Sequence, residues 1–106
     1  MSESFNVASE SVGQTQRVIA TGELDIATVP VLDEAFEAAV GAGDAERIEV
    51  DLTGVTFIDS TGLRLLIRMA ERCEQLRIRS TPVVDRLLQV TGLLDQLPLI
   101  HEQDGS

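Results

Sequence analysis

The segment from Ile48 to Met69 joins a strand pattern to a helix pattern, and it constrains the fold more than any other segment. Apolar and polar residues alternate from position 48 to 52, as in a half-buried strand. A short polar turn and an apolar pair then lead to Asp59-Ser60-Thr61-Gly62, where helical spacing begins. The first N–H groups of a helix have no partners within the helix and favour anions. The sequence therefore predicts that Ser60 lies at a helix N-terminus, where it is suited to carry a phosphoryl group.

Strand and helix patterns also alternate along the rest of the chain. Thr28 and Pro30 mark the start of a first helix, since proline suits a position whose N–H would be unpaired. The expected strands cover residues 5–9, 15–22, 47–52 and 76–79, the expected helices cover residues 28–41, 60–75 and 81–91, and residues 97–100 form a strand or a short helix. This alternation implies one α/β domain with a mixed sheet.

The helix expected from residue 60 has an unusually wide apolar face. Its core-facing residues are Leu63, Leu66, Ile67, Ala70 and Cys73. Leu65, Met69 and Leu76 widen the apolar arc to about 200°, more than a surface helix needs. Two explanations remain open. A neighbouring segment can pack on the extra width, or the extra width can form a partner-binding strip beside Ser60.

The composition excludes several classes of protein. The 106 residues include 18 acidic and 8 basic ones, and the net charge of −10 disfavours binding to nucleic acid or to anionic membranes. A single cysteine, Cys73, rules out a disulfide within the chain. The N-terminus has no signal-peptide pattern and no apolar run is long enough to span a membrane, so we expect a cytoplasmic protein. Residues 101–106 are expected to be a mobile tail.

Catalytic and cofactor patterns are weak. The only histidine, His101, lies near the chain end, and Ser60 lacks the G-x-S-x-G elbow of many hydrolases. One cysteine and one histidine cannot form a structural zinc site, and no nucleotide-binding glycine motif is present. Asp25, Asp51 and Asp59 can group at a sheet edge to hold Mg²⁺, although their spacing does not require it. Neither a cofactor nor enzymatic activity is therefore expected.

Asp59-Ser60-Thr61-Gly62-Leu63 resembles the phosphorylation-site signature of STAS domains, and more narrowly that of bacterial anti-sigma factor antagonists. Val50-Asp51-Leu52 before it and Leu65-Leu66 after it fit the same signature. Three further segments match in order, so that the resemblance covers about residues 5–100: Gly22-Glu23-Leu24-Asp25, Pro30 and Thr91-Gly92-Leu93-Leu94-Asp95. From residues alone, Ser60 reads as a helix N-cap, whereas the resemblance makes it a phosphoacceptor.

The resemblance implies a single STAS domain with four to five strands and three to four helices. It implies that the unphosphorylated chain binds an anti-sigma factor and frees a sigma factor. An anti-sigma factor with serine kinase activity would phosphorylate Ser60, with Thr61 as a second candidate acceptor, and a metal-dependent serine/threonine phosphatase would reverse this. The expected partner-binding residues are Asp25, Asp59, Ser60, Thr61, Gly62, Leu63, Leu65 and Met69. The chain is expected to be a monomer or a weak dimer.

Two rival functions remain, and one local feature departs from the family pattern. The chain can be a STAS subunit of a larger assembly, such as a lipid-transport ATPase or a stress-sensing complex, without a phosphorylation switch. A small hydrolase that uses Ser60 is the other rival. The glycine turn that follows this helix in relatives is missing here, so the helix can end early, near Glu71 or Cys73, instead of at Gln75.

Overall fold

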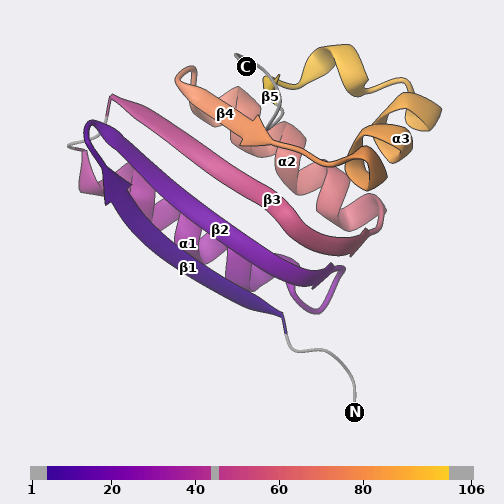
Figure 1. The fold of residues 1–106 in the computed structure, drawn as a ribbon, viewed down its shortest axis with the longest axis horizontal. Helices are drawn as coiled ribbons and strands as arrows, with labels where there is room; N and C mark the ends of the chain where they lie inside the picture. Colours follow the sequence, from indigo (N-terminus) through magenta and orange to yellow (C-terminus); the bar gives the residue numbers. More distant parts are fainter. Residues whose placement is uncertain (1–4, 44–45, 101–106) are drawn as a thin grey trace.

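A computed structural model of the chain describes residues 5–43 and 46–100, and Figure 1 shows their arrangement. The elements in chain order are β1 (Asn6–Val12), β2 (Thr15–Leu24), α1 (Val29–Ala42), β3 (Arg47–Ile58), α2 (Ser60–Arg72), β4 (Leu76–Arg79), α3 (Pro82–Thr91), the 3-10 helix η1 (Leu94–Gln96) and β5 (Leu99–Ile100). No helix among the described residues is both long and apolar enough to cross a membrane. The expected tail and His101 lie outside the described residues.

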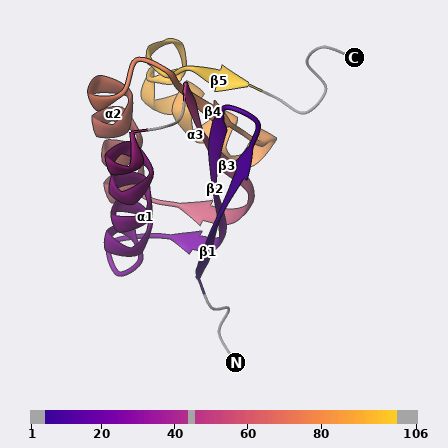
Figure 2. The same ribbon diagram turned by 90° about the vertical axis from the view of Figure 1, so that its left-hand side faces the viewer.

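The five strands form one mixed sheet in the order β1-β2-β3-β4-β5. β1 and β2 are an antiparallel hairpin, and every later pair is parallel. Figure 2 shows α1 and α2 side by side on one face of the sheet. α3 contacts β3 and η1. The predicted α/β fold, a mixed sheet of four to five strands packed with three to four helices, is confirmed, and the structure has five strands and three α-helices.

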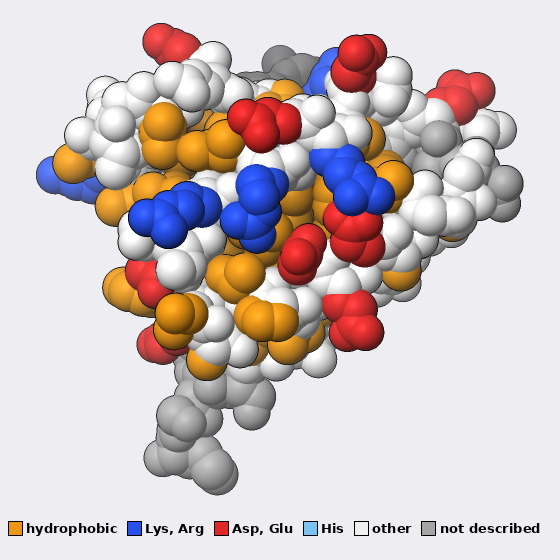
Figure 3. Space-filling view, turned by 180° about the vertical axis from the view of Figure 1, so that it is seen from behind, with side chains coloured by type: hydrophobic (Ala, Val, Ile, Leu, Met, Phe, Trp, Pro, Cys, Tyr) orange, Lys and Arg blue, Asp and Glu red, His pale blue; other side chains and the backbone are white. Residues whose placement is uncertain are grey.

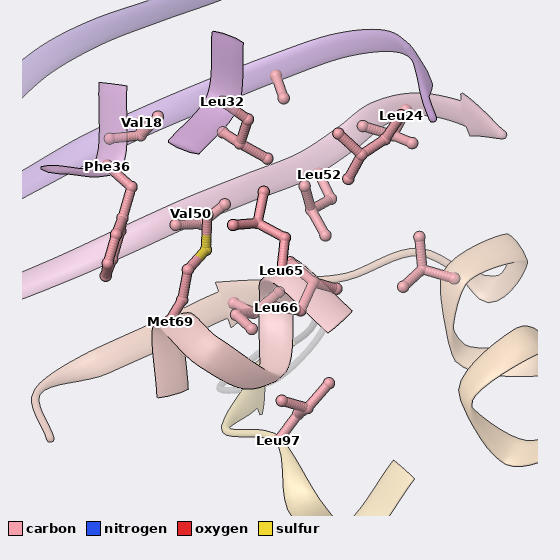
Figure 4. Close-up of a cluster of buried hydrophobic side chains, with 14 of the residues drawn as sticks. Val18, Leu24, Leu32, Phe36, Val50, Leu52, Leu65, Leu66, Met69 and Leu97 are labelled. Carbon is pink, nitrogen blue, oxygen red and sulfur yellow. The ribbon is translucent and has the colours of Figure 1, made fainter. Parts of the chain in front are cut away.

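The hydrophobic core lies between the sheet and the pair of helices α1 and α2. Figure 4 shows their side chains converging on those of β2 and β3. Phe36 from α1, Met69 from α2 and Val50 from β3 are all almost fully buried. An ion pair between Arg72 Nη2 and Glu37 Oε1, 2.8 Å long, joins the two helices at their outer surface. α2 therefore has two packing partners, the sheet beneath it and α1 at its side.

Several boundaries differ from the sequence expectation. β1 continues to Val12 instead of residue 9, and β2 continues to Leu24 instead of residue 22. β3 continues to Ile58, so the expected polar turn before Phe57 is wrong. The expected turn residues are part of the strand, and the register of β3 against β2 shifts beside them. Glycine is needed at position 54, because a Cβ there would lie only 2.6 Å from Thr21 Cγ2. α2 ends at Arg72 instead of Gln75, with extended backbone at Cys73. The early end agrees with the missing glycine turn.

Candidate functional site

The site is built where β2 and β3 end side by side. These strands are parallel, and Leu24 pairs with Ile58 at their last positions. The next residues, Asp25 and Asp59, therefore leave the same edge of the sheet. The backbone N–H of Asp59 donates to the carbonyl of Leu24 at 3.2 Å, which ties the start of α2 to β2.

Asp59, and not Ser60, caps α2. Asp59 Oδ1 accepts hydrogen bonds from the backbone N–H groups of Thr61 and Gly62, at 2.9 and 3.1 Å. The Thr61 hydroxyl also donates to Asp59 Oδ1 at 2.5 Å. This bond and the backbone N–H groups hold the pKa of the Asp59 carboxyl below its ordinary value, against an opposing effect of burial. The interpretation of Ser60 as the N-cap is therefore wrong.

Ser60 is the first residue of α2, and its side chain is exposed. Among the described residues, no side-chain hydrogen bond involves Ser60, whereas the Thr61 hydroxyl is bound to Asp59. A helix start needs a capping side chain at the N-cap, and Asp59 already fills that position. The Ser60 hydroxyl consequently has no structural role in the fold and is open to a partner or an enzyme.

Asp25 organises the turn between β2 and α1. Its Oδ1 accepts from the backbone N–H groups of Ala27 and Thr28, at 3.0 and 3.1 Å. The Thr28 hydroxyl donates to the Glu23 carbonyl at 2.7 Å and accepts from the Asp25 backbone N–H at 2.9 Å. The turn brings Asp25 to the edge that carries Asp59, as its place in the sequence suggested. Its carboxylate is also a structural element of that turn.

Gly62 and Leu63 were expected to contact a partner. Both are buried within the chain, so this structure leaves them no surface for such a contact. A Cβ on Gly62 would lie 2.7 Å from Ile58 Cγ1 and 3.1 Å from Leu24 Cγ. Glycine at position 62 thus lets the first turn of α2 approach the ends of β2 and β3. This internal approach accounts for the glycine without a partner.

The expected docking strip of Leu65 and Met69 is also wrong. Each side chain is only 1% exposed. Figure 4 shows both pointing from α2 toward the sheet. The wide apolar arc of α2 serves two neighbours within the chain, because α1 covers the side that the sheet leaves open. The alternative explanation, packing by a neighbouring segment, holds.

Sequence reasoning missed the apolar side chains that are exposed near this edge. Ile26, in the turn after Asp25, is 74% exposed, and it lines a groove of about 210 Å³ together with Thr61 and Arg64. Phe57 lies in a second groove of about 400 Å³, against Val83 and Val90 of α3. The spacing of positions 83, 87 and 90 on α3, i, i+4 and i+7, could have revealed this second apolar stripe.

The suggested grouping of three aspartates is not observed. Asp51 lies in the middle of β3, where its Oδ1 accepts from the Thr53 backbone N–H and hydroxyl at 2.8 and 2.6 Å. Across residues 5–43 and 46–100, no three histidine, cysteine, aspartate or glutamate side chains gather closely enough to hold a metal ion. Cys73 is a half-buried free thiol at the far end of α2.

A five-stranded mixed sheet, two helices on one face and an exposed serine after a capping aspartate define the class of this chain. The family model described as "Mlab, STAS domain" matches residues 7–100, and the chain belongs to the STAS domain family. Among its relatives is the anti-sigma-B factor antagonist of Staphylococcus aureus. That protein is 31% identical over a match 107 positions long, which spans 96% of this chain and 95% of the relative.

Solved structures agree with this assignment. The crystal structure of an anti-sigma factor antagonist from Mycobacterium paratuberculosis is similar, with a TM-score of 0.78 and 29% identity over 93% of this chain and 89% of that one. The anti-sigma factor antagonist SpoIIAA in its unphosphorylated form has a TM-score of 0.67 and 22% identity over 95% and 90% of the two chains. The SpoIIAA likeness supports the fold alone.

Proposed function

We propose that this chain is an anti-sigma factor antagonist. Its unphosphorylated form binds an anti-sigma factor through the surface around Ser60 and so frees a sigma factor. Phosphorylation of Ser60 switches the binding off. The relatives named anti-sigma-B factor antagonist, which match almost the whole chain, support the function.

One observation carries the role of Ser60. Its hydroxyl is exposed at the start of α2, while Asp59 provides the cap and the Thr61 hydroxyl is bound to Asp59. A phosphoryl group can therefore be added there without removing a bond that holds the fold. The new charge of about −1.5 to −2 would oppose docking of an apolar partner surface.

Exposed apolar side chains beside residues next to Ser60 in the chain, Thr61 in one groove and Ile58 in the other, support a docking surface at this edge. Ile26 flanks the first turn of α2, and Phe57 with Val83 and Val90 lies on the side of α3. Exposed apolar groups that gather around one point are typical of interaction sites. Thr61 contributes at the rim as a half-buried residue and remains a second candidate acceptor.

The remaining partners follow from the same proposal. The anti-sigma factor is the serine kinase, which transfers the γ-phosphoryl group of ATP to Ser60, and a metal-dependent serine/threonine phosphatase removes it. The chain is the substrate of both reactions and catalyses neither. It acts in the cytoplasm as a monomer or weak dimer, without a cofactor and without binding nucleic acid or membrane.

Calorimetric titration of variants with the cognate anti-sigma factor tests the proposal. Ser60→Ala should bind as wild type does and should resist inactivation by the kinase and ATP. Ser60→Asp should lose about 5- to 150-fold in affinity, the usual range of a regulatory coupling. Ser9→Asp places the same charge on the edge strand β1, at an exposed position, and should bind normally. Equal affinity of the two Ser60 variants would argue against a charge-based switch.

A second titration tests the docking surface. Ile26→Ser should weaken binding, because it removes an exposed apolar contact next to Thr61. Val12→Ser is the matched control, since Val12 is also exposed and apolar but lies at the β1–β2 hairpin. If Val12→Ser weakens binding as much as Ile26→Ser does, the partner does not dock at the Ser60 edge.

The rival proposal is a STAS subunit of a larger assembly without a switch, such as a lipid-transport ATPase. The name of the matching family model, "Mlab, STAS domain", keeps it open. Affinity capture with the wild-type chain distinguishes the two. Recovery of a kinase-type anti-sigma factor supports the switch, whereas recovery of a transporter subunit, together with unmodified Ser60 in the captured complex, supports the rival.

A further inference from the structure

The backbone N–H donors of Thr61, Gly62 and Leu63 in the first turn of α2 are already occupied. Asp59 Oδ1 holds the backbone N–H groups of Thr61 and Gly62, and the Asp59 carbonyl accepts from the Leu63 N–H at 3.0 Å. A phosphoryl group on Ser60 would therefore meet a carboxylate where an uncapped helix would offer free N–H groups. Asp25 adds a second carboxylate at the same sheet edge. A cationic side chain nearby would therefore stabilise the phosphorylated form.

Arg64 is placed to supply that cation. It follows Ser60 by four residues on α2, and side chains at this spacing are neighbours on the helix surface. Both side chains are exposed. In the part of the chain that the structure describes, no ion pair involves Arg64, whereas Arg72, further along α2, is bound to Glu37.

Arg68 is less available than Arg64. Both arginines line the 210 Å³ groove, which has no acidic side chain in its lining. Arg68 also lines a groove of about 340 Å³ between α1 and α2, where Asp33, Glu37 and Glu71 are among the lining residues. Figure 3 shows basic side chains in a row across the helix-bearing face, with acidic side chains close to only part of that row.

We propose that Arg64 is the counter-ion of phosphorylated Ser60. This inference rests on the proposed phosphorylation of Ser60 and adds its regulation. The guanidinium of Arg64 forms an ion pair with the phosphoryl oxygens, and this pair offsets the repulsion from Asp59. The same pair removes Arg64 from the groove beside Ile26. Phosphorylation thus changes the docking surface in two ways. It adds an anion at Ser60, and it makes the Arg64 guanidinium unavailable to the partner.

The test uses the full chain with phosphoserine installed at position 60 during translation, so that no kinase is needed. The second pKa of the phosphoryl group is measured by ³¹P NMR titration and compared among variants. Arg64→Gln should raise this pKa by about 0.3–0.7 pH units, which corresponds to the coupling of an exposed ion pair. Arg68→Gln should raise it less. Arg86→Gln, on α3 and beside the other groove, should leave it unchanged.

An unchanged phosphoryl pKa in Arg64→Gln would overturn the proposal. So would an equal or larger shift in Arg68→Gln or Arg86→Gln, because the effect would then not belong to Arg64. The result is independent of the kinase. If the cognate kinase modifies another residue, the proposed function fails, while the ion pair in the installed phosphoserine form is still measured.

Discussion

The start of α2 and its inner face are held in place by different forces. Hydrogen bonds to the Asp59 carboxylate and to the Leu24 carbonyl fix the start, and the Ser60 side chain there remains in solvent. The inner face, which includes Leu65 and Met69, is fixed by burial between the sheet and α1. One helix therefore has an exposed side chain at its start, Ser60, whose substitution should leave stability nearly unchanged, and capping and buried residues whose substitution should reduce it. Four substitutions test that division.

Met69→Lys should have the largest effect, because it places an ammonium group in the apolar core. We expect a loss of unfolding free energy of about 3 kcal/mol or more. Chemical denaturation measures it. Val90→Lys makes the same change at a position that is 76% exposed and should alter stability by less than about 0.5 kcal/mol. A mild effect of Met69→Lys would contradict the assignment of the inner face to the core.

Asp59→Ala should have the second largest effect, because it removes the cap of α2 and should lower the unfolding free energy by about 1–2 kcal/mol. Asp59→Asn keeps a capping oxygen but cannot ionise. Because the folded state lowers the pKa of the Asp59 carboxyl below 3.8, its ionised form stabilises the fold above pH 3.8. This stabilisation is lost as the pH falls through the lowered pKa.

Denaturant titrations between pH 6 and pH 2 check the sign of this effect. The stability advantage of wild type over Asp59→Asn should be greatest at the upper end and should shrink on acidification. An advantage that grows as the pH falls would show that the carboxylate is not stabilised by its hydrogen bonds.

Gly62→Ala tests the point where the two regions meet. Alanine gains about 1 kcal/mol in helix propensity, but its Cβ would lie 2.7 Å from Ile58 Cγ1, and overpacking of that kind costs about 1–3 kcal/mol. We expect the unfolding free energy, measured by thermal unfolding, to fall by a net amount of about 1 kcal/mol. Gly41→Ala in α1 is the control, because its Cβ would meet no atom within 4 Å and should be neutral or stabilising. A stabilised Gly62→Ala would mean that the first turn is not closely packed.

Ser60→Ala should have the smallest effect on stability, below about 0.5 kcal/mol, because Ser60 neither caps α2 nor is buried. Thr61→Val removes the hydroxyl that donates to Asp59 and should cost about 1 kcal/mol. Thermal melts of both variants at pH 7 make the comparison. If Ser60→Ala is the more damaging of the two, Ser60 contributes to the fold and the division of α2 is wrong.

The sequence was sufficient to predict the order of the strands and helices. It was insufficient to predict which segments pack against each of them. The order of strands and helices and the place of Ser60 at a helix start follow from periodicity and from local motifs. The possible early end of α2 followed from the departure from the family pattern, whereas periodicity alone placed that end at Gln75. The burial of Leu65 and Met69 does not, because a wide apolar arc looks the same whether a partner or α1 covers it. Thr53 and Gly54 suggested a turn because they are polar or small. They lie within β3 instead, because β3 pairs there with β2, whose residues are far away in the sequence.

The hydrogen bond from the Asp59 N–H to the Leu24 carbonyl would matter to a kinase that acts on Ser60 as proposed. This bond forms when β2 and β3 are paired, so such a kinase would meet a surface assembled from two distant stretches of chain. A synthetic peptide of the same local sequence lacks one of these stretches and would be a poor substrate. Modification would thereby be restricted to correctly folded copies, and misfolded chains would stay outside the proposed signalling cycle.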